Sequence, residues 1–142
     1  MSGYRETYRK AVTADMCDLY GHMNVQFYVA AISDSFFSLI TTAGLGKSAA
    51  ADDRIGLVAV NMNIDYLSEV DAGDVIYMQG AIVSIGGKKV TCKWRLYDQA
   101  TDRQAMEATV LYVCMDLDTR RSRDIPQHLL ETAQEVVVTE ED

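Results

Sequence analysis

The stretch that most constrains the fold of this chain is a short polar segment that leads directly into a long apolar one. Residues 15–24 read DMCDLYGHMN, and residues 25–43 read VQFYVAAISDSFFSLITTA. Apolar side chains in the second segment recur at steps of three and four residues, which is the spacing of a helix with one continuous apolar stripe. Further alanine and phenylalanine residues widen the stripe, so we expect one long helix that is buried on most sides.

The polar segment places a candidate catalytic site at the start of this helix. The first backbone N–H groups of a helix have no intrahelical partner and lie at the positive end of its dipole, so they can hold a developing negative charge. Asp18 before such donors would act as a general base or a nucleophile, a combination that suits hydrolysis of an acyl group. Each residue also has a plainer interpretation: Asp18 and Asn24 favour helix caps, Gly21 favours turns, and His22 alone could be a surface histidine.

The remaining patterns predict a sheet. We expect a small-residue loop at 46–54 after the long helix, tight turns between strands, and a short last helix begun by the only proline, Pro126. Strands with short connections and one long helix favour an α+β fold, in which an antiparallel sheet wraps around that helix as a single domain over residues 1–142. The predicted strands are 4–13, 56–67, 75–85, 89–97 and 104–116, and the predicted last helix is 126–135.

Composition narrows the function further. A chain of 142 residues with 49% hydrophobic residues can bury one core, and a net charge of −8 argues against a nucleic-acid-binding surface. The three cysteines have no CxxC spacing, which favours reduced thiols and a cytoplasmic location. We expect no signal peptide and no membrane span, because polar residues interrupt the longest apolar segment. The two histidines lack a ligand-like spacing, so we expect neither a metal nor an organic cofactor.

The polar motif and the order of elements resemble the hotdog-fold acyl-CoA thioesterases, specifically the group similar to 4-hydroxybenzoyl-CoA thioesterase. The resemblance covers roughly residues 4–130. It implies that Asp18 attacks the thioester carbonyl or activates water, and that the N–H of Val25 is the oxyanion donor. Two positions, Met16 and Val25, depart from the family pattern. Because of them, the resemblance does not identify which acyl group the substrate carries. The matching pieces are Asp18-x-x-Gly21-His22-x-Asn24-x-x-x-Tyr28, Ile64-Asp65-Tyr66-Leu67, Gly73-Asp74, Ser84-Ile85-Gly86, and Asp116 through Pro126.

The candidate site residues fall into three groups. Asp18, His22 and Asn24 are the catalytic candidates, and Gly21 and Val25 form the oxyanion turn. The substrate-binding candidates are Tyr28 and Met62, which could line the acyl pocket, Asn61, and a phosphate-binding group, Arg120, Arg121 and Arg123, which we rank ahead of Lys88 and Lys89. The resemblance also implies a homodimer or homotetramer, with the active site between subunits and Asn61 to Asp65 supplied by the neighbouring chain.

The predicted function is hydrolysis of a small or medium acyl-CoA to a free acid and coenzyme A. Two alternatives remain open. An acyl-thioester hydratase or dehydratase on the same fold would need a histidine and an acid poised across the α and β carbons of the substrate. A non-catalytic acyl-CoA binding protein would use Asp18 only as a helix cap. Release of thiol and the ultraviolet absorbance of an enoyl thioester separate these functions.

Overall fold

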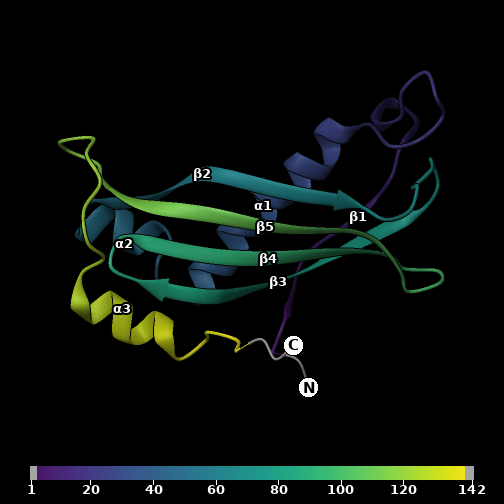
Figure 1. The fold of residues 1–142 in the computed structure, drawn as a ribbon. Coiled ribbons are helices and arrows are strands. Elements are labelled where there is room, and N and C mark those ends of the chain that lie inside the picture. Colours follow the sequence, from purple (N-terminus) through teal and green to yellow (C-terminus); the bar gives the residue numbers. More distant parts are fainter. Residues whose placement is uncertain (1–2, 140–142) are drawn as a thin grey trace.

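A computed structural model of the chain describes residues 3–139, which form a five-stranded antiparallel sheet with one long helix across it (Figure 1). The sheet has the order β1-β3-β4-β5-β2, so β1 and β2 are its edges. This is the predicted α+β arrangement. The elements are β1 (Arg5–Ala11), the 3-10 helix η1 (Ala14–Met16), α1 (Val25–Thr42), α2 (Lys47–Asp52), β2 (Ile55–Tyr66), β3 (Val75–Gly86), β4 (Lys89–Asp98), β5 (Arg103–Asp116) and α3 (Gln127–Gln134).

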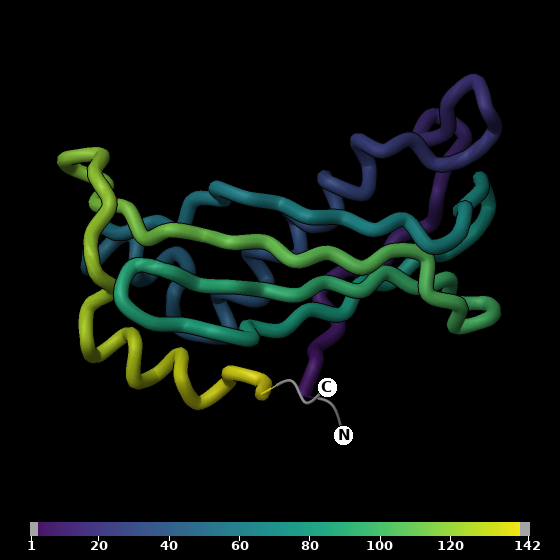
Figure 2. The backbone as a smooth tube through the Cα atoms, in the orientation of Figure 1, coloured from purple at the N-terminus to yellow at the C-terminus, as the bar shows by residue number. Residues whose placement is uncertain are grey.

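Helix α1 crosses one face of the sheet diagonally and packs its buried side against it (Figure 2). Its buried residues follow the predicted spacing of three and four: Tyr28, Ala31, Ile32, Ser35, Phe36, Leu39 and Ile40. Phe36 stacks on Tyr112 of β5 with ring centroids 4.2 Å apart. On β3, Gly80 leaves room for the buried indole of Trp94, since a Cβ there would lie 2.3 Å from its ring. The contact of Phe36 with Tyr112 holds α1 against the sheet, and the contact of Gly80 with Trp94 packs β3 on β4.

The prediction that α1 is buried on most sides is wrong. Phe37 is 63% exposed, and Val58 of the neighbouring edge strand β2 is 41% exposed. Periodicity identifies residues that share a face, but β2 is the last strand of the sheet, so within residues 3–139 nothing covers that side of the helix. We call the exposed apolar residues on this side the open face; they are Val29, Phe37, Val58 and Met62, which line a groove of about 370 Å³ between α1 and β2.

The predicted loop at 46–54 is also corrected, because residues Lys47–Asp52 form helix α2. Its Lys-Ser-Ala-Ala-Ala sequence has the high helix propensity of alanine, which outweighs the loop-like appearance of small residues. The other predicted elements are present, with ends that differ by a few residues at most. No helix in the described range 3–139 has the length and apolar character needed to span a membrane.

Candidate active site

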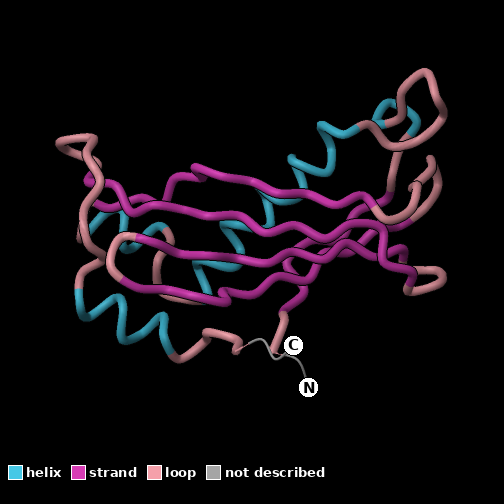
Figure 3. The backbone as a smooth tube through the Cα atoms, viewed as in Figure 1, coloured by secondary structure: helices cyan, strands magenta, loops and turns pink. Residues whose placement is uncertain are grey.

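The segment before α1 folds into a tight turn that presents Asp18. The backbone N–H of Gly21 donates to the carbonyl of Asp18 over 2.9 Å, and the N–H of Asp18 donates to the carbonyl of His22 over 3.1 Å. Gly21 has a φ of +86°, a left-handed conformation that side chains other than glycine disfavour. The turn lies beside residues 67–74, the loop between β2 and β3, because the N–H of Met23 donates to the carbonyl of Val70 over 2.7 Å (Figure 3).

Two hydrogen bonds hold the carboxylate of Asp18. Its Oδ2 accepts from Nδ2 of Asn24 over 2.9 Å, and its Oδ1 accepts from the N–H of Tyr20 over 2.9 Å. The bond from Asn24 is the largest cause of a lowered pKa for Asp18, followed by the bond from Tyr20. Desolvation in an apolar cleft would strengthen Asp18 as a base, but it does not dominate in this chain. The side chain is exposed, so the donated hydrogen bonds outweigh desolvation and keep the carboxylate ionised.

Asn24 connects this carboxylate to the helix. It is the N-cap of α1, and its Oδ1 accepts from the N–H of Gln26 over 3.1 Å. The N–H of Val25 has no acceptor among residues 3–139, so it is one of the unpaired donors at the start of the helix. The cap therefore places an ionised carboxylate and a free donor next to each other.

His22 contacts the loop between β2 and β3. Its Nδ1 lies 2.6 Å from Oδ1 of Asp71, and its Nε2 lies 3.1 Å from Oε2 of Glu69. The bond to Asp71 is the main cause of a raised pKa for His22. The direct hydrogen bonds to the carboxylate of Asp18 come from Asn24 and Tyr20, while His22 is bonded to the β2–β3 loop.

Sequence reasoning missed Glu69 and Asp71 as site residues. In the sequence, Asp71-Ala-Gly-Asp74 has the composition of a turn between strands, and only its Gly73-Asp74 part entered the family resemblance. The two acids of this turn could have suggested a partner for a histidine. A local pattern does not reveal that the turn lies against His22, because His22 and Asp71 are 49 positions apart in the chain.

A cavity of about 360 Å³ opens beside the start of α1. Its lining is mostly apolar, with His22 and Glu69 at one side: His22, Met23, Val25, Tyr28, Tyr66, Leu67, Ser68 and Glu69. The rings of Tyr28 and Tyr66 meet edge to face, with centroids 5.0 Å apart and planes at 85°. Burial is the first cause of a raised pKa for Tyr28, so its phenol keeps the proton at neutral pH. Tyr28 thus lies where a substrate-binding residue is expected.

The structure does not bring Asn61 and Met62 to this cavity within one chain. Met62 lies in the groove along the open face. Asn61 points to the opposite face of the sheet, where it lines a polar hollow of about 460 Å³ with Lys93 and Glu107. Neighbouring residues of a strand project to opposite faces, so the two candidates cannot line one pocket of the same chain.

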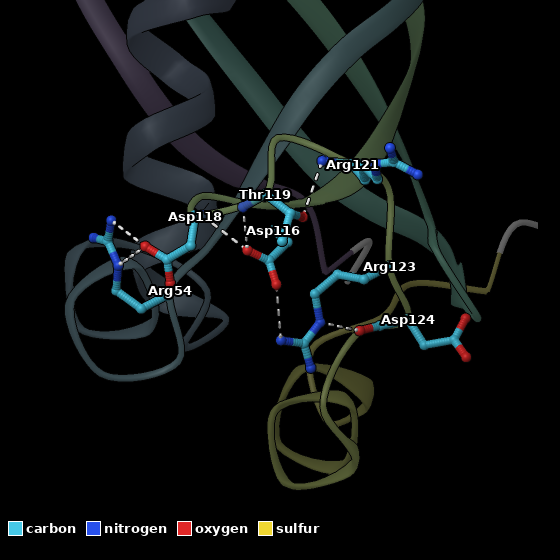
Figure 4. A network of polar contacts seen from close by, with 7 residues as sticks. All are labelled: Arg54, Asp116, Asp118, Thr119, Arg121, Arg123 and Asp124. Carbon is cyan, nitrogen blue, oxygen red and sulfur yellow. Dashed lines mark hydrogen bonds and ion pairs between the residues drawn. The ribbon is translucent and has the colours of Figure 1, made fainter.

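The three arginines lie in the loop after β5. In this loop Asp116 organises the backbone: its Oδ1 accepts from the N–H groups of Asp118 and Thr119 at 2.8 and 3.0 Å (Figure 4). Arg123 is partly committed, with Nη1 3.9 Å from Asp116 and Nε donating to the carbonyl of Asp124 over 3.1 Å. The guanidinium of Arg121 points away from these acids (Figure 4). Arg121 is therefore less engaged with the acids of this loop than Arg123.

This arginine loop and the Asp18 turn lie at opposite ends of β2. Ile55 pairs with Asp116 at one end, and Tyr66 lines the His22 cavity at the other. Twelve residues separate the ends inclusively, which at about 3.3 Å per residue gives roughly 35–40 Å. The arginines and Asp18 of one chain therefore cannot contact the same thioester.

Comparison with known proteins gives the chain a family. Residues 12–132 match the model of the Thioesterase-like superfamily. The chain belongs to this superfamily. This membership confirms the prediction of an enzyme that hydrolyses thioesters. No curated protein matches the chain in sequence.

Solved structures confirm the hotdog fold. The hypothetical protein SAV2348 from Staphylococcus aureus, solved in complex with CoA, has a TM-score of 0.82 at 20% identity, covering 98% of this chain and 90% of that one. The probable thioesterase YbaW from Escherichia coli has a TM-score of 0.78 at 19% identity, with coverage of 94% and 99%. Slr0204 from Synechocystis, a 1,4-dihydroxy-2-naphthoyl-CoA thioesterase, has a TM-score of 0.76 at 16% identity, with coverage of 90% and 94%.

Proposed function

We propose that this thioesterase hydrolyses a small or medium acyl-CoA to the free acid and coenzyme A, with Asp18 as the attacking group. The observation that carries the proposal is the bond from Asn24 to Asp18, because it fixes an ionised carboxylate beside the unpaired N–H of Val25. Superfamily membership supports thioester chemistry, and the likeness to a protein solved with CoA supports a coenzyme A thioester as substrate.

The reaction follows from this geometry. A carboxylate oxygen of Asp18 attacks the thioester carbon, and the N–H of Val25 stabilises the oxyanion that forms. The carbon–sulfur bond then breaks, coenzyme A leaves as thiolate and takes up a proton, and the acyl group remains on Asp18 as an anhydride. Water hydrolyses this anhydride to the free acid and restores Asp18. The lowered pKa of Asp18 keeps its carboxylate ionised at neutral pH, so an oxygen is available for direct attack.

The contacts of His22 argue against the hydratase alternative. Such an enzyme needs a histidine nitrogen free to take a proton from the substrate, and both ring nitrogens of His22 lie against carboxylates. His128 is paired with Asp53, its Nε2 3.0 Å from Oδ1 of that residue, and Asp53 follows α2.

A panel of aliphatic and aromatic acyl-CoAs, assayed for free thiol, tests the function. We expect thiol release from at least one member of the panel. We also expect that, with an enoyl-CoA, the enoyl absorbance falls only if thiol is released. Binding of the panel without release would instead support the non-catalytic binding protein, and loss of enoyl absorbance alone would support the hydratase.

We further propose that two copies pair antiparallel along their β2 edges and share the active sites. Strand β2 has a free edge next to the apolar open face, and an unpaired edge of twelve residues beside exposed apolar side chains calls for a partner. Antiparallel pairing sets the Ile55 end of one strand against the Tyr66 end of the other. Arg120 and Arg121 of one copy then approach the Asp18 turn of the second, where they can bind the coenzyme A phosphates.

The predicted cytoplasmic location also remains a proposal. Its support is that Cys17, Cys92 and Cys114 are all free thiols, as expected in a reducing compartment.

A further inference from the structure

The carboxylates of Asp71 and Glu69, which contact the ring of His22, determine the charge of that ring. A neutral imidazole has one N–H donor and one acceptor nitrogen, while an ionised carboxylate only accepts. Asp71 lies 2.6 Å from Nδ1 and Glu69 lies 3.1 Å from Nε2, so both contacts are satisfied only when both nitrogens carry a proton. The geometry itself therefore selects the imidazolium cation.

The loop that carries Asp71 is held in place by its own hydrogen bonds. The N–H of Asp71 donates to Oδ2 of Asp74 over 2.8 Å, and the N–H of Asp74 donates to the carbonyl of Asp71 over 3.1 Å. Gly73, with a φ of +96°, donates to the carbonyl of Val12 over 2.8 Å. This network fixes the backbone of the turn that carries Asp71, and the turn holds the carboxylate of Asp71 next to His22.

The acids that face His22 all favour a positive charge on it, and the tyrosines beside it are neutral. Asp18 lies on the same turn as the histidine, and Glu69 and Asp71 lie on the β2–β3 loop. Helix α1 contributes Tyr28 and the end of β2 contributes Tyr66, both of which have raised pKa values and are neutral at physiological pH. The acids raise the pKa of His22, with the bond to Asp71 first among the causes.

We propose that Asp71 and Glu69 are positioning residues that keep His22 as a cation at the start of α1, so that it supplies a fixed positive charge and not a base. The catalytic part of this inference rests on the proposed thioesterase function. The cation acts on Asp18, whose pKa the charge of His22 helps to lower, and on the oxyanion that forms beside Val25. Asp71 and Glu69 act only through His22.

The pH dependence follows from the direction of the shift. A raised pKa in the folded chain means that the cation is complete below the ordinary value of about 6.5 and is lost as the pH rises through the folded value. Thiol release should therefore fall on the alkaline side as His22 loses its proton. Removing Asp71 should move this fall to lower pH.

NMR titration of the imidazole groups tests the charge directly, because the chain has only two histidines, His22 and His128. We expect Asp71→Asn to lower the titration midpoint of His22, the double variant Asp71→Asn/Glu69→Gln to lower it further, and Asp71→Glu to restore part of the shift. Asp53→Asn is the matched control, since it removes the carboxylate paired with His128 and should leave His22 unchanged. The spectra also report whether each variant is folded.

The same variants assayed for thiol release test the catalytic part. We expect the alkaline limb of the kcat profile to shift with the His22 midpoint in Asp71→Asn and to stay in place in Asp53→Asn. An unchanged His22 midpoint in folded Asp71→Asn overturns the proposal, and a lowered midpoint with an unchanged kcat profile overturns its catalytic part. If the wild-type protein releases no thiol from any acyl-CoA, the proposed function fails while the titration still decides the charge of His22.

Discussion

At the residue scale, Asn24 uses one amide group for two neighbours. Its oxygen caps α1 through Gln26, and its nitrogen donates to Asp18. The cap is a stability feature worth about 1 kcal/mol in typical helices, whereas the bond to Asp18 affects the charge and position of the attacking group. A substitution can separate these two contributions, because aspartate caps helices as well as asparagine but has no N–H to donate.

Asn24→Asp should therefore keep the melting temperature close to wild type and lower kcat at least about tenfold, since it replaces a donor by a like charge beside Asp18. Thermal denaturation and thiol release measure the two effects. Asn24→Ala is the comparison that loses both the cap and the donor. Equal melting temperature and unchanged kcat in Asn24→Asp would show that Asn24 only caps the helix.

The path through an anhydride on Asp18 predicts a specific isotope pattern. In a single turnover with enzyme in excess in ¹⁸O-labelled water, direct attack transfers an unlabelled carboxylate oxygen of Asp18 to the product whenever water attacks the aspartyl carbon of the anhydride. Mass spectrometry should then find ¹⁸O in the peptide that contains Asp18. Label found only in the product acid, with none in this peptide after repeated turnovers, would contradict this path in favour of activated water or attack only at the acyl carbon.

At the element scale, the helix and strands were predictable because their signals are local. The spacing in residues 25–43 predicted α1, and Asn24 was expected as its cap. Asp18 and Asn24 lie within hydrogen-bond distance, as their closeness in the chain allows. The contacts of His22 with Glu69 and Asp71 were missed, since they depend on how two distant loops meet. Burial of α1 was overestimated for the same reason, as periodicity does not state which elements cover each face.

The open face between α1 and β2 should be the contact between copies. Phe37→Asp should weaken self-association strongly, because it places a charge in an apolar contact, while the exposure of Phe37 in the single chain means that the fold should tolerate the change. Phe37→Leu is the control that keeps the face apolar. Light scattering at low micromolar concentration should report a dimer or larger for wild type and control. A wild-type monomer that retains full activity would contradict the proposed pairing.

At the scale of the whole molecule, the two halves of the proposed site lie at opposite ends of β2. The Asp18 turn adjoins the Tyr66 end, and the arginine loop adjoins the Ile55 end. We identified the Asp18 segment and the arginine cluster as candidates from the sequence. The sequence could not predict that the length of the sheet separates them. If antiparallel pairing brings them together, each active site needs both chains, which a mixing experiment can test.

Mixing two variants that are each impaired in a different half of the site should restore activity. One variant carries Asp18→Asn with its arginines intact, and the other carries Arg120→Ala and Arg121→Ala with Asp18 intact. After denaturation and refolding together, half of the dimers are mixed, and each contains one complete site, so about a quarter of wild-type kcat/KM should return. If the activity of the mixture does not exceed the sum of the separate variants, the proposed sharing is wrong. Either Asp18 and the arginines of one functional site belong to the same chain, or the arginines are not part of the site.

The central claim is that Asp18 attacks the thioester, and kinetics of Asp18→Asn test it most directly. The exposed amide can occupy the same turn, so the fold and the binding of acyl-CoA should persist. Loss of the nucleophile should lower kcat about 10²–10⁴-fold on the best acyl-CoA, as measured by thiol release with the fold checked by circular dichroism. Retention of more than roughly a third of the wild-type kcat by the folded variant would contradict the claim.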